Sequence, residues 1–160
     1  MGGTGPDKEA ITPEGIEELR AEIEQLEGPA RTEMAARIKA ARELGDLKEN
    51  ADYHIAKEDQ GHLEGRIRRL RERLNNAEVV EAGDAEGDVF AFGQTAEVLE
   101  ERSGKTTTWT LVGSTEANLA EGKLSAESPV GEALRDTPVG DAVEVETPKG
   151  TKTYLVKKLV

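Results

Sequence analysis

The sequence has no cysteine, few aromatic residues and no long apolar run. Each of these absences argues against a class of protein. Without cysteine, disulfide frameworks, thiolate nucleophiles and zinc–thiolate sites are ruled out, and a reducing compartment such as the cytoplasm is expected. No apolar run approaches the ~20 residues of a membrane-spanning helix, so no membrane partner is expected. Aromatic residues make up only 3% of the chain and charged residues 34%, which favours elongated helices with wide solvated faces over one thick globule.

The chain also lacks an excess of basic residues, because its 160 residues carry a net charge of -12. A protein that binds nucleic acid unaided needs an excess of Lys and Arg on some face to neutralise phosphates. Any contact with DNA or RNA is therefore expected to be indirect and guided by another protein.

Two stretches of the chain place apolar residues at alternating steps of three and four, the spacing of a coiled-coil seam. The first runs from Ile16 to Ala41 and the second from Ala56 to Ala77. Two seams joined by a short polar turn bury their stripes against each other, which predicts an antiparallel helical hairpin and a monomer. Thr12 is the expected cap of the first helix, and Gly28-Pro29 predicts a kink or short break within it.

The character of the chain changes after Glu81, where Gly, Thr and Val become frequent and the seam ends. An α+β fold is predicted, in which a small antiparallel sheet with one helix follows the hairpin. The expected domains are a flexible tail at 1–10, the hairpin at 11–80 with the second helix starting near Leu47, and the sheet domain at 81–160. Strands are expected at 89–92, 95–100, 107–112, 142–147 and 153–156, and a short helix at 130–134.

The turn of the hairpin, residues 45–53, carries Asp46 and Glu49. Two interpretations of this pair stay open. As an acidic capping box, Asp46 accepts from the backbone at position 49 while Glu49 reaches back. As a metal site, two carboxylates on one short arc hold part of the coordination shell of a hard cation such as Mg²⁺, and another molecule supplies the remaining ligands. Such a site binds Mg²⁺ only weakly in the free protein.

Other residues near the turn also allow two interpretations. Arg42, Lys48 and Lys57 can pair with the acids or bind phosphate oxygens. Tyr53 can stack on a base or pack against the first helix. The five arginines between positions 66 and 73 can pair with glutamates of the first helix or bind a partner.

Two motifs, in this order, resemble signatures of the Gre family of bacterial transcript cleavage factors, most closely its GreA-type members. The first is the turn with its flanks, Ala41 to His54, which reads ARELGDLKENADYH. The second is Ser128 to Leu134, which reads SPVGEAL and precedes the closing Thr147-Pro148-Lys149-Gly150. The resemblance extends from about residue 11 to the end of the chain.

The resemblance implies a coiled coil that enters the secondary channel of bacterial RNA polymerase and an FKBP-like sheet domain that docks at the rim of the channel. Asp46 and Glu49 then help to hold the second Mg²⁺ of the polymerase active centre, which is shared and not tightly held by the free protein. The polymerase cleaves the 3′ end of backtracked RNA and resumes synthesis. The chain is thus expected to be an accessory factor and not itself an enzyme, reaching the nascent RNA only through the polymerase.

The same resemblance assigns expected roles to further residues. These are Arg42 and Lys57 for RNA phosphates, Asn50 and Tyr53 for orienting the acids or the RNA end, and Ser128, Pro129 and Gly131 for polymerase docking. An inhibitor of the secondary channel on the same scaffold remains an alternative, as does a coiled-coil module unrelated to transcription. Retention of both acids disfavours the inhibitor, because inhibitory relatives typically alter the turn.

Overall fold

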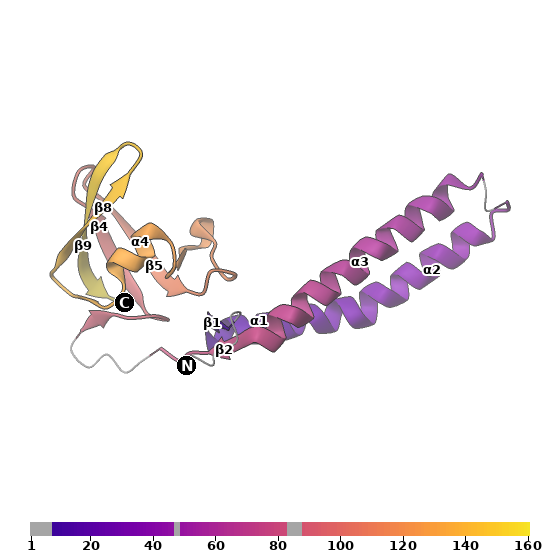
Figure 1. Ribbon diagram of the computed structural model, residues 1–160, viewed down its shortest axis with the longest axis horizontal. Helices are drawn as coiled ribbons and strands as arrows, with labels where there is room; N and C mark the ends of the chain where they lie inside the picture. Colours follow the sequence, from indigo (N-terminus) through magenta and orange to yellow (C-terminus); the bar gives the residue numbers. More distant parts are fainter. Residues whose placement is uncertain (1–7, 47–48, 83–87) are drawn as a thin grey trace. The chain divides into compact units, whose positions relative to one another are not determined.

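The computed structural model describes residues 8–46, 49–82 and 88–160 of the chain (Figure 1). Two compact units divide it: residues 16–76 form the helical unit, and residues 77–160 together with the first 15 residues form the sheet unit. The predicted α+β class, with a helical hairpin followed by a small sheet and one helix, is confirmed.

The bounds of the two units differ from the expected domains at 11–80 and 81–160 because two short strands flank the hairpin in sequence. Strand β1 (Glu9–Ile11) pairs in parallel with β2 (Ala77–Val79), and both belong to the sheet unit. Of the expected tail, Glu9 and Ala10 therefore lie in a strand, and residues 1–7 lie outside the described residues.

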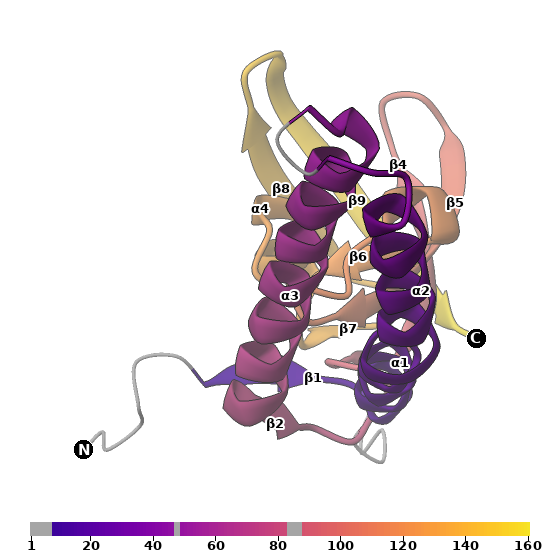
Figure 2. The same ribbon diagram turned by 90° about the vertical axis from the view of Figure 1, so that its right-hand side faces the viewer.

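The helical unit is built from a first arm of two helices and a second arm of one. The helices are α1 (Pro13–Gln25), α2 (Arg31–Arg42) and α3 (Ala51–Asn76). Figures 1 and 2 show α2 and α3 running side by side in opposite directions. The residues predicted to form the seam include eight that are buried: Ile16, Leu19, Ile23, Ile38, Ala41, Ala56, Ile67 and Leu70. Apolar burial between the two arms thus holds the hairpin together, as the spacing predicts.

The predicted interruption at Gly28-Pro29 is a single π-helical turn, Leu26–Ala30, rather than a break in the helix. Proline has no N–H to donate and its ring clashes with the preceding turn, so a regular α-helix cannot continue through it. A π turn absorbs that mismatch locally and lets α2 resume at Arg31.

Thr12 caps α1 as predicted, and a distant carboxylate holds it in place. The Oγ1 atom of Thr12 accepts a hydrogen bond from the Gly15 N–H at 3.0 Å. Glu116, in the loop after strand β5 (Lys105–Val112), accepts hydrogen bonds from the backbone N–H and the hydroxyl of Thr12 and from the Gly113 N–H. Sequence spacing gives no sign of this contact, because the partners are 104 positions apart.

Ion pairs across the hairpin connect its two arms. Arg66 pairs with Glu22 and Arg71 with Glu27, which confirms for these two arginines the predicted pairing with glutamates of the first arm. In two further pairs the arginine belongs to the first arm and the acid to the second: Arg31 pairs with Glu64 at 2.7 Å, and Arg37 pairs with Asp59 at 2.7 Å. The arginines are exposed and the acids are partly exposed, so each pair adds only modestly to the stability of the hairpin.

The ion pairs predict an acid-sensitive hairpin. Hydrogen bonds from Arg71 to Glu27 and from Arg31 to Glu64 lower the pKa of both carboxyl groups below their usual value of 4.5. A lowered folded-state pKa adds stability above the unfolded-state pKa and loses it as the pH falls through the folded-state value. We therefore expect Glu27→Gln and Glu64→Gln to lower the melting temperature at pH 7, with the difference from wild type vanishing at pH values well below 4.5.

Circular dichroism melts at a series of pH values would measure this effect. Glu33→Gln, an exposed substitution on α2, is the matched control and should leave the difference small at every pH. A constant gap between wild type and Glu27→Gln from pH 3 to pH 7 would show that the pair has no pH-linked role.

The sheet unit contains a five-stranded sheet in the order β6-β5-β4-β9-β8 (Figure 1). The strands are β4 (Thr95–Glu100), β5, β6 (Lys123–Ser125), β8 (Ala142–Thr147) and β9 (Gly150–Leu159). All neighbours are antiparallel except β5 and β6. A separate pair joins β3 (Val89–Phe90) to β7 (Thr137–Pro138), and helix α4 (Pro129–Leu134) packs against β8. The core is formed by side chains such as Phe90, Leu111 and Leu134.

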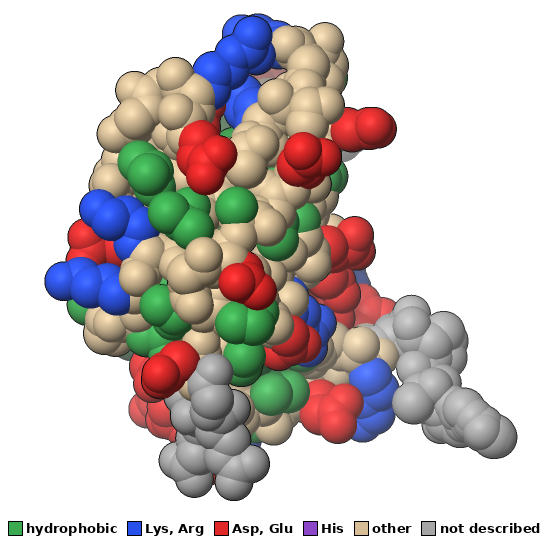
Figure 3. Space-filling model, turned by 90° about the vertical axis from the view of Figure 1, so that its left-hand side faces the viewer, with side chains coloured by type: hydrophobic (Ala, Val, Ile, Leu, Met, Phe, Trp, Pro, Cys, Tyr) green, Lys and Arg blue, Asp and Glu red, His purple; other side chains and the backbone are tan. Residues whose placement is uncertain are grey.

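On the side drawn in Figure 3, the described residues of the sheet unit form no broad apolar face. That view shows hydrophobic side chains in several small groups with acidic and basic side chains between them. Across the part of the chain that the structure describes, no helix is long and apolar enough to cross a membrane.

Candidate functional site

The far end of the helical unit is a short connection between α2 and α3 that contains both predicted acids. Helix α2 ends at Arg42, and Gly45 then adopts φ +128°, a conformation that side-chain-bearing residues rarely adopt. Asp46 and Glu49 follow, both exposed, before α3 begins at Ala51. Leu47 and Lys48, which the sequence also placed in this turn, lie outside the described residues.

The structure brings the two acids together in one open hollow. This hollow, the acidic hollow, has a volume of about 370 Å³ and is lined by Leu44, Asp46, Glu49, Asn50, Ala51 and Asp52. Three acidic residues, Asp46, Glu49 and Asp52, thus line one open space at the end of the hairpin. A negative field concentrated in this way attracts cations and repels phosphate.

Asn50 ties the ends of the two arms together. Its Oδ1 atom accepts a hydrogen bond from the Tyr53 N–H at 2.9 Å, and its carbonyl accepts from the His54 N–H, so Asn50 is the N-cap of α3. Its Nδ2 atom donates to the carbonyl oxygen of Ala41, near the end of α2. One side chain therefore caps one helix and holds the last turn of the other.

This cap corrects two expectations. The second helix begins at Ala51 and not near Leu47, and Asp46 and Glu49 precede the cap instead of forming a capping box. The physical reason is that the Asn50 amide serves as cap and cross-link at once, which a carboxylate with no donor cannot do. The acids are consequently not used to start α3.

The remaining predicted residues of the turn lie around Tyr53. The Arg42 guanidinium lies 5.9 Å from the centre of the half-buried Tyr53 ring, so this tyrosine packs against the first arm. His54 meets the same ring edge-on at 5.8 Å. Lys57, one turn further along α3, donates from Nζ to the Gln60 Oε1 atom at 2.8 Å and is exposed.

The chemistry of the acidic hollow fits a hard divalent cation. Carboxylate oxygens are the ligands that Mg²⁺ prefers, and Mg²⁺ commonly takes only one or two of them while keeping several waters. Among the described residues, however, no group of three or more His, Asp or Glu side chains is arranged to enclose a metal ion. Asp46 and Glu49 are thus suited to share a cation with other ligands.

The three residues expected to dock onto the polymerase lie at the start of α4, and only one presents an exposed side chain. Ser128 is the N-cap, accepting from the Gly131 N–H at 3.0 Å and donating to the Ser125 carbonyl at 2.7 Å. Gly131 is buried, and a Cβ atom there would lie 1.8 Å from the Ser125 carbonyl oxygen. Pro129, in contrast, is exposed.

Sequence reasoning missed an apolar group beside the acids. Leu44 and Ile55 are 70% and 50% exposed, and Leu44 lines the acidic hollow. Leu44 follows the end of α2, and Ile55 is adjacent to Ala56 and so departs from the three-four spacing, which was the available signal for Ile55. Asp52, in the first turn of α3, was likewise not singled out.

Nearly the whole chain is similar to known proteins. Residues 9–79 match the family described as "Transcription elongation factor, N-terminal", and residues 85–159 match "Transcription elongation factor, GreA/GreB, C-term". "Transcription elongation factor GreA" of Rhodospirillum rubrum is 43% identical over 150 residues, 94% of this chain and 96% of the relative. The protein of the same name from Nautilia profundicola is 44% identical over 152 residues, 95% and 94% of the two chains.

Among solved structures, GreA factor homolog 1 (Gfh1) of Thermus thermophilus is 27% identical to this chain. The alignment covers 96% of this chain and 99% of that one, with a TM-score of 0.41.

Proposed function

Because the chain belongs to the GreA/GreB family of transcription elongation factors, we propose that it stimulates Mg²⁺-dependent cleavage of the RNA 3′ end in backtracked complexes of bacterial RNA polymerase. The observation that carries this proposal is the pairing of Asp46 and Glu49 in one open hollow at the end of a long hairpin. A narrow arm that presents carboxylates at its end can deliver them into a channel that a globular domain cannot enter.

Asp46 and Glu49 would each contribute carboxylate oxygens to a Mg²⁺ ion whose other ligands come from the polymerase and the RNA. When bound, Mg²⁺ lowers the pKa of a coordinated water and stabilises charge on the leaving oxygen. The carboxylates themselves stay in place and orient these ligands, because Asn50 fixes the helix ends on either side of them. The protein is in this view an activator of the polymerase's own nuclease and not itself the enzyme.

The negative charge of the chain favours binding to the polymerase protein first and contact with RNA only afterwards. The net charge of -12 and the three carboxylates of the acidic hollow disfavour free nucleic acid as a ligand. Arg42 and Lys57 would reach RNA phosphates only once the polymerase has brought the RNA end to the hairpin. Pro129, the exposed member of the predicted docking group, is the residue of that group that would contact the rim of the channel.

Cleavage of 3′-end-labelled RNA in a stalled, backtracked polymerase complex with Mg²⁺ tests the proposal. Adding the protein should release short labelled fragments much faster than polymerase releases them alone. Binding without faster cleavage would instead support a channel inhibitor, and absence of both binding and cleavage would support a coiled-coil module unrelated to transcription.

Substituting Asn50→Asp should separate capping from cross-linking. Aspartate keeps an acceptor for the Tyr53 N–H but removes the donor to Ala41, so α3 stays capped while the tie between the arms is lost. We expect the maximal cleavage rate to fall about 10-fold through misplacement of the acids, with the concentration for half-maximal stimulation unchanged.

Asn50→Ser is the comparison, because it also retains a cap and removes the tie without adding a charge. Equal losses in both variants would assign the effect to the tie. A full maximal rate in both would show that the Ala41 contact does not position the acids.

A further inference from the structure

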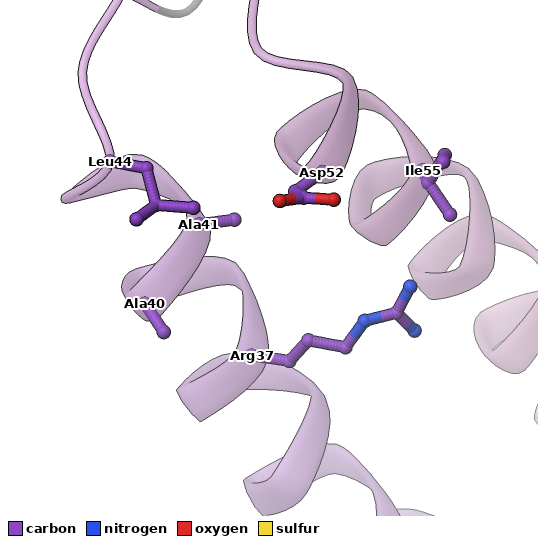
Figure 4. Close-up of a pocket in the computed structure, with 6 residues that line it drawn as sticks. All are labelled: Arg37, Ala40, Ala41, Leu44, Asp52 and Ile55. Carbon is purple, nitrogen blue, oxygen red and sulfur yellow. The ribbon is translucent and has the colours of Figure 1, made fainter.

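A second hollow lies between the end of α2 and the first turns of α3, beside the acids. It has a volume of about 300 Å³ and is lined by Arg37, Ala40, Ala41, Leu44, Asp52 and Ile55. Figure 4 shows Ala40, Ala41 and Leu44 on one helix and Asp52 and Ile55 on the other, with Arg37 reaching across the gap. Leu44 and Asp52 also line the acidic hollow, so the two spaces are adjacent.

The apolar wall of this side hollow is exposed to an unusual degree. Leu44 is 70% and Ile55 50% exposed, and no other large hydrophobic residue described within the helical unit is comparably exposed. Neither lies on the seam, so the hairpin folds without burying them. Two large apolar side chains facing one concave space are typical of a surface that becomes buried on binding.

Of the two charged side chains that line the side hollow, one has an ion-pair partner among the described residues and the other has none. Arg37 donates from Nη1 to the Asp59 Oδ2 atom at 2.7 Å, so its charge is already neutralised. Asp52, by contrast, has no hydrogen-bond or ion-pair partner among the residues that the structure describes. In Figure 4 its carboxylate lies in the gap between the two helices. The space therefore combines an apolar wall with one negative charge at its edge.

We propose that the side hollow receives a lysine or arginine side chain of the partner protein. The aliphatic stem lies against Leu44 and Ile55, and the cationic end pairs with Asp52. A nucleic-acid phosphate does not fit this space, because it would face Asp52 and the described lining residues offer no cation that is free of an ion pair. The inference rests on the proposed function in one respect, since it takes bacterial RNA polymerase as the partner that presents the cation.

The contact predicts a change in affinity and not in chemistry. Asp52→Asn, Asp52→Lys and the double variant Leu44→Ser/Ile55→Ser are compared with wild type in the backtracked-complex cleavage assay at increasing factor concentrations. We expect the half-maximal concentration to rise about 10-fold for the double variant and for Asp52→Lys, and less for Asp52→Asn. Ile55→Ser alone should keep a maximal rate within about twofold of wild type, because Ile55 lines the side hollow only, whereas Leu44 and Asp52 also line the acidic hollow.

Matched controls separate this contact from a general loss of exposed side chains. Leu119→Ser removes a leucine of similar exposure, 65%, from the sheet unit, and Glu58→Gln neutralises an exposed acid further along α3. Both should bind as wild type does. Circular dichroism should give unchanged melting for the Leu44→Ser/Ile55→Ser protein, since neither side chain packs in the seam.

The outcomes distinguish the proposals from each other. If wild type stimulates cleavage while all side-hollow variants keep its half-maximal concentration, the side hollow is not a binding site and the proposed function stands. If only the apolar variant weakens binding, the occupant is not cationic and the proposed contact is wrong. If wild type neither binds polymerase nor stimulates cleavage, both proposals fail.

Discussion

The double substitution Asp46→Asn/Glu49→Gln is expected to reduce stimulated RNA cleavage on the order of 100-fold, to the rate of polymerase alone. Amides keep the size and hydrogen-bonding ability of the carboxylates but are poor Mg²⁺ ligands. The fold should not change, because Asn50 caps α3 and both acids are exposed outside the helices. Rates of 3′-fragment release, measured at saturating factor, check this prediction.

Two measurements make this result specific. Glu43→Gln, an exposed acid just after α2 that lines neither hollow, should keep the full rate. Competition for polymerase should show that the double variant still binds, since docking would occur through other surfaces. Retained cleavage in the double variant would remove the acids from the mechanism, and lost binding would make them docking residues.

The substitution Gly131→Ala is expected to destabilise the sheet unit by about 3 kcal/mol. A Cβ atom at this position would lie 1.8 Å from the Ser125 carbonyl oxygen and 2.8 Å from its carbon, and both atoms belong to backbone that cannot rotate away. Helix α4 would have to move away from Ser125, the last residue of β6. This movement would also expose Leu134, which is fully buried on α4.

The single tryptophan allows the unfolding of the sheet unit to be measured separately from that of the hairpin. Trp109 lies in β5, so its fluorescence reports unfolding of the sheet unit. Gly131→Ala should shift that transition to lower denaturant concentration. Gly61→Ala is the control: nothing lies within 4 Å of its added Cβ in α3, so it should stabilise the hairpin by about 1 kcal/mol and leave the tryptophan transition in place.

An unchanged tryptophan transition in Gly131→Ala would mean that α4 can shift at little cost. Gly131 could then serve docking directly, as the sequence motif alone suggested. A large shift would instead explain the glycine by packing and leave Pro129 as the exposed member of the predicted docking group.

Elements with strong local signals were predictable from the sequence. The seam from Ile16 to Ala41 and the cap at Thr12 follow from side-chain periodicity and helix-start chemistry, and the structure confirms both. Strands β1 and β6 were not predicted, because each has three residues and is defined by a distant partner. Short segments of this kind carry too little pattern to be recognised locally.

In the candidate site, too, residues with a local sequence signal were predictable and features that depend on distant contacts were not. The acids at 46 and 49 could be singled out because they interrupt a helical pattern. The start of α3 was placed too early, since an acidic pair and an asparagine are both good caps and only the contact with Ala41 decides between them. The side hollow could not be predicted, because it needs the approach of two helices that leaves Leu44 and Ile55 facing one space.

The parallel pairing of β1 with β2 makes the sheet unit a discontinuous domain. Parallel neighbours require a crossover connection, and here the entire hairpin is that connection. A fragment that starts at Ala77 would leave β2 without its partner and Glu116 without Thr12. To obtain the sheet unit alone, the hairpin would have to be replaced by a linker that joins Thr12 to Ala77. Lengthening α2 and α3 by the same amount would instead extend the hairpin and preserve the pairing of β1 with β2 at its base.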